Sequence, residues 1–112
     1  LTNGDRLRLV VTLNCLNGWF ASPDTSSLGE ALVAASGGGA IGVFAASGYG
    51  YTWEQDMVAT ALLNRLKQGG RPTLGELCTD AKVQAFLGGA STDLLKTYTL
   101  LGDPALRLKG IP

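Results

Sequence analysis

The chain has 112 residues, a common size for one domain, and its 46% hydrophobic and 16% charged residues exclude a disordered chain. Nine lysines and arginines balance nine aspartates and glutamates without clustering, which argues against nucleic acid or a membrane surface as a partner. The sequence contains no histidine, so a dyad, triad or zinc site that depends on histidine cannot be completed within these residues.

The first predicted elements are a strand, a helix and a second strand. Residues 6–13 alternate and then become apolar on both faces, which predicts a buried strand ending near Cys15. Ser27 and Glu30 have capping-box spacing and predict a helix, which the glycines at 37–39 end. The apolar residues 40–47 predict the second strand and are too few to span a bilayer. A crossover helix between two strands makes them parallel, so we expect an α/β fold.

The second half of the sequence predicts three more helices. Residues 52–55, Thr-Trp-Glu-Gln, match a second capping box, and the helix they open ends before the glycines at 69–70. A third box at 73–76 opens a helix whose apolar stripe is Leu74, Leu77, Cys78, Ala81 and Ala85. Residues 91–95 indicate a short helix, and a turn at 102–104 leads into a strand-like segment at 105–108.

The two cysteines occupy different kinds of position. Cys15 follows the first predicted strand, and ligands in open α/β sheets bind outside the carboxyl ends of parallel strands. We therefore expect its sulfur to lie in a crevice beside Ser47, where the second strand ends; its alternative interpretation is a packed core thiol. Cys78 lies on an apolar helix stripe, which predicts a buried thiol that forms no disulfide with Cys15.

Several segments, in order along the whole chain, resemble gingipain-type cysteine peptidases of the caspase-like clan. Cys-Leu-Asn-Gly-Trp-Phe at 15–20 resembles the Cys-x-Asn-Gly-x-Phe segment that carries the nucleophile of this family. The helix from Leu28, the strand from Gly39 and the Gly-Asp-Pro segment at 102–104 resemble the elements that follow it. Asn14 and the bulky Trp19 depart from the family pattern.

The resemblance implies a caspase-like three-layer αβα sandwich with a mainly parallel sheet. Residues 1–112 would then be the C-terminal half of a cysteine peptidase catalytic domain, and the upstream half of the same domain is the implied partner. That half would supply the catalytic histidine, followed by glycine, on the preceding strand. The isolated chain is expected to be inactive, and extracellular or cell-surface location is implied by the family.

The resemblance also implies the roles of individual residues. Cys15 would be the nucleophile of an endopeptidase acting on peptide or protein substrates, with its backbone N–H as one oxyanion donor. Residues 46–53 resemble the segment that lines the S1 pocket, so Ser47, Gly48 and Trp53 are predicted to bind substrate, with Trp53 as an aromatic wall. Trp53 has the alternative interpretation of an aromatic packed on the sheet.

Two other hypotheses come from the same sequence. A catalytically silent pseudo-peptidase or structural interaction module would dock its sheet on another chain. Gly48-Tyr49-Gly50 follows a strand and precedes a helix, which allows a weak phosphate- or nucleotide-binding hypothesis, whereas the G-x-G-x-x-G match at 37–42 precedes a strand and is rejected. No cofactor is required by the peptidase mechanism. The carboxylates lack EF-hand spacing, so calcium could bind only through irregular loops.

Overall fold

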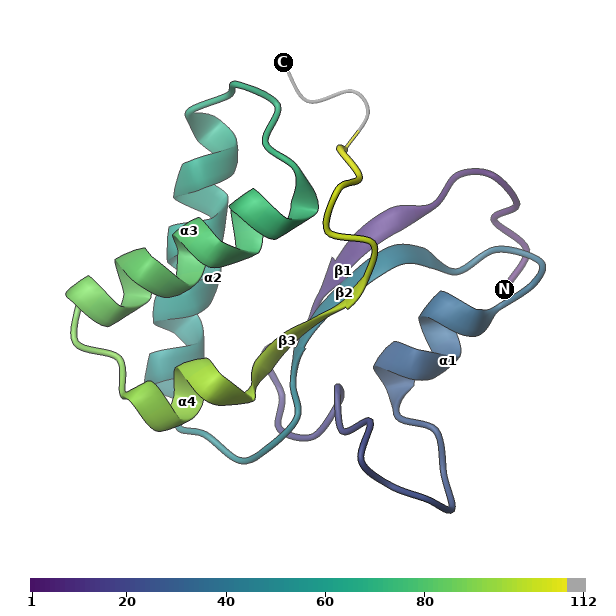
Figure 1. Ribbon diagram of the computed structural model, residues 1–112, viewed down its shortest axis with the longest axis horizontal. Helices are drawn as coiled ribbons and strands as arrows, with labels where there is room; N and C mark the ends of the chain where they lie inside the picture. Colours follow the sequence, from purple (N-terminus) through teal and green to yellow (C-terminus); the bar gives the residue numbers. More distant parts are fainter. Residues whose placement is uncertain (109–112) are drawn as a thin grey trace.

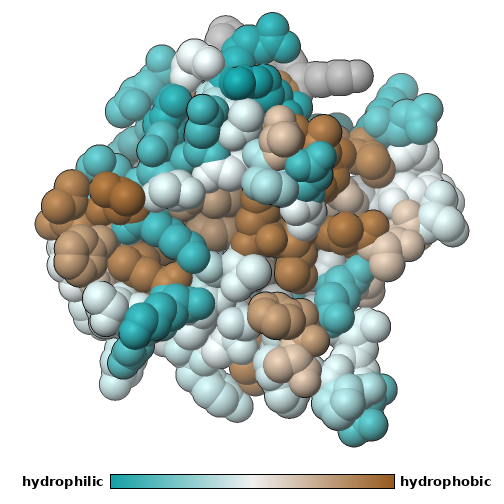
Figure 2. Space-filling view, viewed as in Figure 1, coloured by the Kyte–Doolittle hydropathy of each residue, from teal (hydrophilic) through white to brown (hydrophobic). Residues whose placement is uncertain are grey.

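The computed structural model describes residues 1–108 and contains a three-stranded mixed sheet with helices on both sides (Figure 1). On the face viewed there, hydrophobic residues gather in several separate patches between hydrophilic ones (Figure 2). The sheet order is β1-β2-β3, with β1 parallel to β2 and β3 antiparallel to β2. The elements in chain order are β1 (Arg8–Val11), α1 (Leu28–Ala34), β2 (Ala40–Ala46), α2 (Thr52–Lys67), α3 (Leu74–Leu87), α4 (Thr92–Thr97) and β3 (Tyr98–Gly102).

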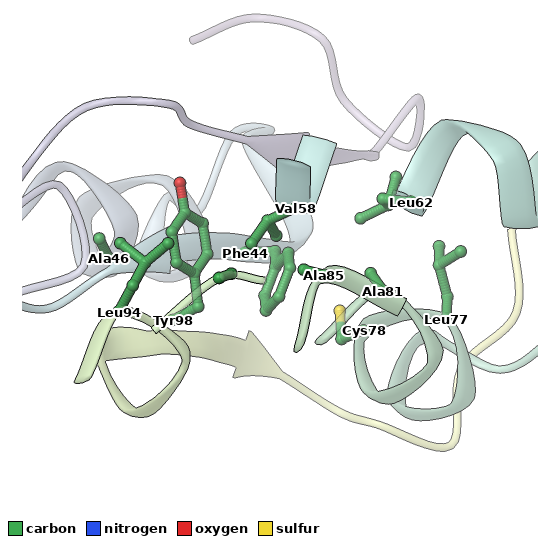
Figure 3. Close-up of a cluster of buried hydrophobic side chains, with 11 residues drawn as sticks. Phe44, Ala46, Val58, Leu62, Leu77, Cys78, Ala81, Ala85, Leu94 and Tyr98 are labelled. Carbon is green, nitrogen blue, oxygen red and sulfur yellow. The ribbon is translucent and has the colours of Figure 1, made fainter. Parts of the chain in front are cut away.

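The middle strand β2 separates two apolar clusters. Val43 and Ala45 pack on one side of the sheet with side chains of α1, whereas Phe44 and Ala46 lie on the other with α2, α3 and α4. The larger cluster also holds Tyr98, whose ring lies 5.1 Å from that of Phe44 between centroids (Figure 3). Because side chains alternate along a strand, one buried strand serves both layers. The result is the expected α/β sandwich of helix, sheet and helices.

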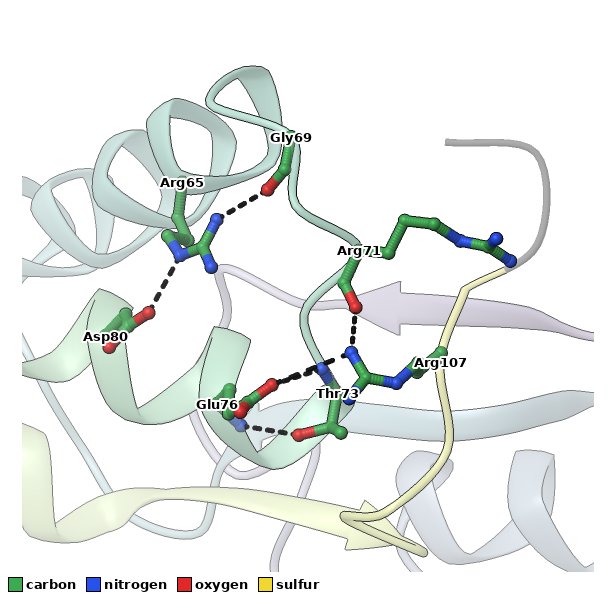
Figure 4. A network of polar contacts seen from close by, with 7 residues as sticks. All are labelled: Arg65, Gly69, Arg71, Thr73, Glu76, Asp80 and Arg107. Carbon is green, nitrogen blue, oxygen red and sulfur yellow. Dashed lines mark hydrogen bonds and ion pairs between the residues drawn. The ribbon is translucent and has the colours of Figure 1, made fainter. Parts of the chain in front are cut away.

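Helices α2 and α3 pack against each other as a hairpin. The predicted stripe of α3, from Leu74 to Ala85, is its buried face. Arg65 of α2 contacts Asp80 of α3 at 2.8 Å and donates to the carbonyl of Gly69, which joins the two helices near their connection (Figure 4). The predicted capping boxes of α1 and α3 are both present, so local sequence signals set these two helix starts.

The capping box predicted at residues 52–55 is wrong. The N-cap of α2 is Tyr51, which makes no side-chain cap bond. Glu54 is buried instead, and its carboxylate accepts the backbone N–H of Ser91 at 2.7 Å, across to the start of α4. Gln55 also points into the protein. Tertiary hydrogen bonds have replaced the local one that the sequence suggested.

The last strand also differs from the prediction. It is β3, which follows α4 directly, whereas the segment at 105–108 has only a turn and a bridge between Arg107 and Thr73. Within the described residues the sheet is mixed, with the parallel pair β1–β2 and the antiparallel pair β2–β3, which is consistent with the expected α/β caspase-like fold. The first strand, Arg8–Val11, is shorter than the predicted 6–13, although the Thr12 N–H still donates to the carbonyl of Phe44 in β2 at 3.1 Å.

Candidate active site

The loop that carries Cys15 crosses the carboxyl ends of the two parallel strands. The Leu16 N–H donates to the carbonyl of Gly48 at 3.4 Å, and the Gly18 N–H donates to the carbonyl of Ala46 at 2.9 Å. These bonds join the loop after β1 to the chain that leaves β2. The predicted proximity of Cys15 to the end of the second strand is therefore present, at the edge of the sheet where α/β proteins bind ligands.

The backbone of this loop is held in an unusual conformation. Leu16 has φ 65°, in the left-handed region that costs an L-residue with a side chain about 1–2 kcal/mol. Gly18 lies so close to β2 that an added Cβ would be 3.0 Å from both Cβ and O of Ala45. The carbonyl of Asn17 accepts the Gly29 N–H of α1 at 2.8 Å, which fixes the far side of the loop. Such strain persists only where surrounding contacts impose it, and it gathers at functional sites.

The Cys15 sulfur is half-buried between two polar groups. Its S–H donates to the carbonyl of Gly50 at 3.6 Å, and the side-chain amide Nε2 of Gln55 donates to the sulfur at 3.7 Å. A Cβ at position 50 would clash with Cδ1 of Leu94, so a larger residue there would require the Leu94 side chain to move. The segment after β2 and the first turn of α2 thus form one wall around the thiol.

The three predicted substrate-binding residues lie along this same segment. The Ser47 hydroxyl donates to the carbonyl of Thr97 at 2.9 Å, so it ties β2 to the end of α4. Gly48 contacts the Cys15 loop through its carbonyl. Trp53 is 57% exposed and lines a groove of about 450 Å³ with Tyr49, Gly50 and Tyr51. Cys15 is not among the residues that line this groove, which adjoins the thiol through Gly50, the acceptor of the Cys15 S–H. The substrate role of Ser47, Gly48 and Trp53 stays a prediction.

Comparison with known proteins decides the family. The family model for peptidase family C25 matches residues 1–109. The chain belongs to peptidase family C25. The gingipain-type cysteine peptidase family that the sequence pattern predicted is thereby confirmed. None of the curated protein sequences matches it.

Two solved structures share the fold of this C25 chain. One is the Arg-specific cysteine proteinase gingipain R, with a TM-score of 0.79 and 24% identity. The other is the complex of RgpB pro- and mature domains from Porphyromonas gingivalis, with a TM-score of 0.82 and 22% identity. Each match covers 99% of this chain but 28% of the solved chain. The C25 chain thus spans about a quarter of the length of the structures that it matches.

The second cysteine of the C25 chain lies away from this site. Cys78 is 5% exposed, unbridged, and surrounded by the larger apolar cluster (Figure 3). Burial raises the pKa of its thiol to about 12, and the nearby Lys82 only partly opposes that effect. The prediction of a buried, unbridged core thiol is confirmed.

Sequence reasoning missed Gln55. The residue shares a helical face with Val58 and Leu62, the buried residues of the next two turns of α2. A polar residue on an apolar stripe is the signal that could have identified it, since a buried amide needs a hydrogen-bond partner.

Residues 1–108 contain no group of three or more cysteine, aspartate or glutamate side chains that could hold a metal ion. In the same part of the C25 chain, no helix is both long and apolar enough to cross a membrane.

Proposed function

We propose that this chain is the nucleophile-bearing half of a cysteine endopeptidase catalytic domain. The Cys15 thiolate attacks the carbonyl carbon of a peptide bond, a thioester forms, and the amine leaves with a proton. Water then hydrolyses the thioester and regenerates the thiol. The observation that carries the proposal is the position of Cys15, half-buried on a strained loop at the carboxyl ends of two parallel strands in a C25 chain.

The upstream half of the same domain is the proposed source of the histidine. The chain has no histidine of its own, and the solved chains that share its fold are more than three times as long. Strand β1 is at the edge of the described sheet. Beside it is an open groove of about 700 Å³, whose apolar lining comes mainly from Leu7, Leu9, Val11, Leu62, Leu66 and Leu106. A further strand there would pair the free edge and cover this apolar surface.

The oxyanion that forms during attack needs preorganised donors. Among the hydrogen bonds of residues 1–108, none is donated by the Cys15 backbone N–H, which supports its proposed role as one donor. Ser47 and Gly48 would hold the substrate backbone, and Trp53 would wall the pocket for the side chain. The reaction needs no cofactor, because a thiol and an imidazole supply both nucleophile and proton carrier. Calcium would serve only to hold loops, and location outside the cell belongs to the same proposal by likeness to gingipains.

The test is hydrolysis of a mixed peptide library by the chain alone and by the chain joined to its upstream segment. The chain alone should be inactive, whereas the joined protein should cleave peptides. Cys15→Ala should lower that activity at least about a thousandfold, while Cys78→Ala, the matched control, should retain it. If the joined protein cleaves nothing, or cleaves equally well with Cys15→Ala, the chain is better described as a structural pseudo-peptidase.

A further inference from the structure

Gln55 buries a side-chain amide in the protein interior, where few hydrogen-bond acceptors are available. Its side chain is 2% exposed and lies in the first turn of α2. Burying an amide without a hydrogen bond is costly, so the partner that it has is informative. Within residues 1–108, the one acceptor that its amide nitrogen meets is the sulfur of Cys15, at 3.7 Å.

The two contacts of the sulfur act on different protonation states. The carbonyl of Gly50 can only accept a hydrogen bond, so it holds the neutral S–H. The amide of Gln55 can donate to the sulfur in either state, and a donor binds a negative charge more strongly than a neutral group. The amide therefore favours the thiolate, the form that attacks a carbonyl. Gln55 belongs to the N-terminal turn of α2, the positive end of the helix dipole, which also favours a negative charge on a nearby sulfur.

We propose that Gln55 is a further catalytic residue of the Cys15 site, whose side-chain amide stabilises the thiolate by donating a hydrogen bond to it. This rests on the proposed function, in which Cys15 is the nucleophile. The residue would complement, not replace, the histidine of the upstream half: the imidazole carries the proton, and the amide holds the sulfur in place.

The titratable groups near the sulfur must be known before a pH profile can be interpreted. Tyr98 of β3 donates its hydroxyl to the carbonyl of Thr12, and burial raises its pKa to about 12. It therefore stays neutral at the pH of the experiment. Asp56 of α2 is exposed, and Asp93 of α4 lines the neighbouring groove. Glu54 is bonded to the Ser91 N–H.

Two substitutions separate an electrostatic role from a packing role. Gln55→Met keeps the length of the side chain but removes the donor, whereas Gln55→Glu keeps the shape almost unchanged and brings a negative charge. If the amide stabilises the thiolate, the rate of Cys15 alkylation should fall in the order wild type, Met, Glu. If Gln55 only fills space, the closer shape of glutamate should leave the rate nearer to wild type than methionine does.

The measurement is the pH dependence of iodoacetamide alkylation, read at Cys15 by peptide mass spectrometry in this chain and in the protein joined to its upstream segment. For Gln55→Met we expect the midpoint to rise by about half to one pH unit and the rate at neutral pH to fall about three- to tenfold. Gln84→Met, at an exposed glutamine of α3, is the matched control and should match wild type. Identical midpoints in the wild type and both Gln55 variants would overturn the proposal.

A second measurement needs no substitution, and so it stands even where a variant does not fold. In the wild-type chain, alkylating Cys15 should shift the side-chain amide resonances of Gln55 in a nitrogen–proton correlation spectrum, while those of the exposed Gln68 and Gln84 stay in place. An unshifted Gln55 resonance would contradict the contact. Peptide hydrolysis separates the two ideas: activity that does not need Cys15 defeats the proposed function, whereas Cys15-dependent activity with unchanged alkylation profiles defeats only the role of Gln55.

Discussion

Cys15 and Cys78 bring the same functional group into two different surroundings. The sulfur of Cys15 is half-buried on a loop and has a carbonyl and an amide as partners. That of Cys78 is buried in α3 among apolar side chains of the sheet and of α2. A thiol becomes reactive when its surroundings favour the thiolate, and burial in an apolar cluster does the opposite. The local environment, and not the residue type, therefore divides the two cysteines into a candidate nucleophile and a packing residue.

The largest expected contrast is in alkylation before and after unfolding. Burial raises the pKa of Cys78 from 9.0 to about 12, so its thiolate population in the folded chain is roughly a thousandfold smaller than in the unfolded one. We expect Cys78 to react about that much more slowly in buffer than in guanidinium, whereas Cys15 changes far less. Iodoacetamide rates at each cysteine, read by mass spectrometry, test this. Equal acceleration of both thiols would mean that the two environments are alike.

The second contrast concerns stability. Leu77 is 1% exposed and belongs to the cluster around Cys78. Leu77→Ala should therefore lower the free energy of unfolding by about 2–4 kcal/mol, through lost burial and a cavity. Leu13→Ala, at a 39% exposed position in the loop before Cys15, should cost less than about 1 kcal/mol. Urea unfolding followed by circular dichroism gives both values, and similar losses would contradict the assignment of the core to the Cys78 side.

The third contrast appears at alkaline pH. Below about pH 9 both folded and unfolded chains hold the Cys78 proton; between about 9 and about 12 only the folded chain does. The unfolded chain then binds fewer protons, so stability should fall as pH rises through that window. Tyr98, whose pKa burial raises from 10.0 to about 12, acts in the same direction.

Urea midpoints measured from about pH 8 to about pH 11 should fall less in Cys78→Ala than in wild type. At neutral pH that variant should lose only about 1 kcal/mol, since one atom is removed. A steeper slope in Cys78→Ala would reverse the sign argued here.

The smallest expected effect tests the strain beside Cys15. Leu16→Gly relieves the left-handed conformation but adds chain entropy to the unfolded state, so stability should change by less than about 1 kcal/mol. Leu13→Gly, in the same loop but with an ordinary φ, receives only the entropic penalty and should be the less stable of the two. Thermal denaturation gives the order of stability of the two variants. If Leu16→Gly is the less stable one, the side-chain contacts of Leu16, and not its backbone strain, dominate at this position.

The sequence could predict those parts of the fold that depend on local signals. The parallel pair of β1 and β2 and the capped starts of α1 and α3 are confirmed, because alternation and capping boxes act over a few residues. Strand β3 was missed, since Tyr98 both ends α4 and begins the strand with no turn residue between them. Its pairing with β2 depends on chain distant in sequence.

The same limit applies to the site. The spacing of strand and loop could predict where Cys15 lies, because carboxyl ends of parallel strands share one edge. It could not predict Gln55, because the choice between a local cap and a distant sulfur depends on where α2 packs. Tertiary contacts decide between these two arrangements, and the order of residues along the chain does not reveal such contacts.

The bond between Glu54 and the backbone of Ser91 has a consequence for how this family can vary. The acceptor is a side chain but the donor is a main-chain N–H, so the two positions are not equally constrained. At position 91, any residue except proline can supply the N–H, and the Ser91 hydroxyl, which caps α4, could be replaced by another capping group. Position 54 needs a buried acceptor of the right reach. Among descendants of this sequence, drift should accumulate at 91 while selection holds 54.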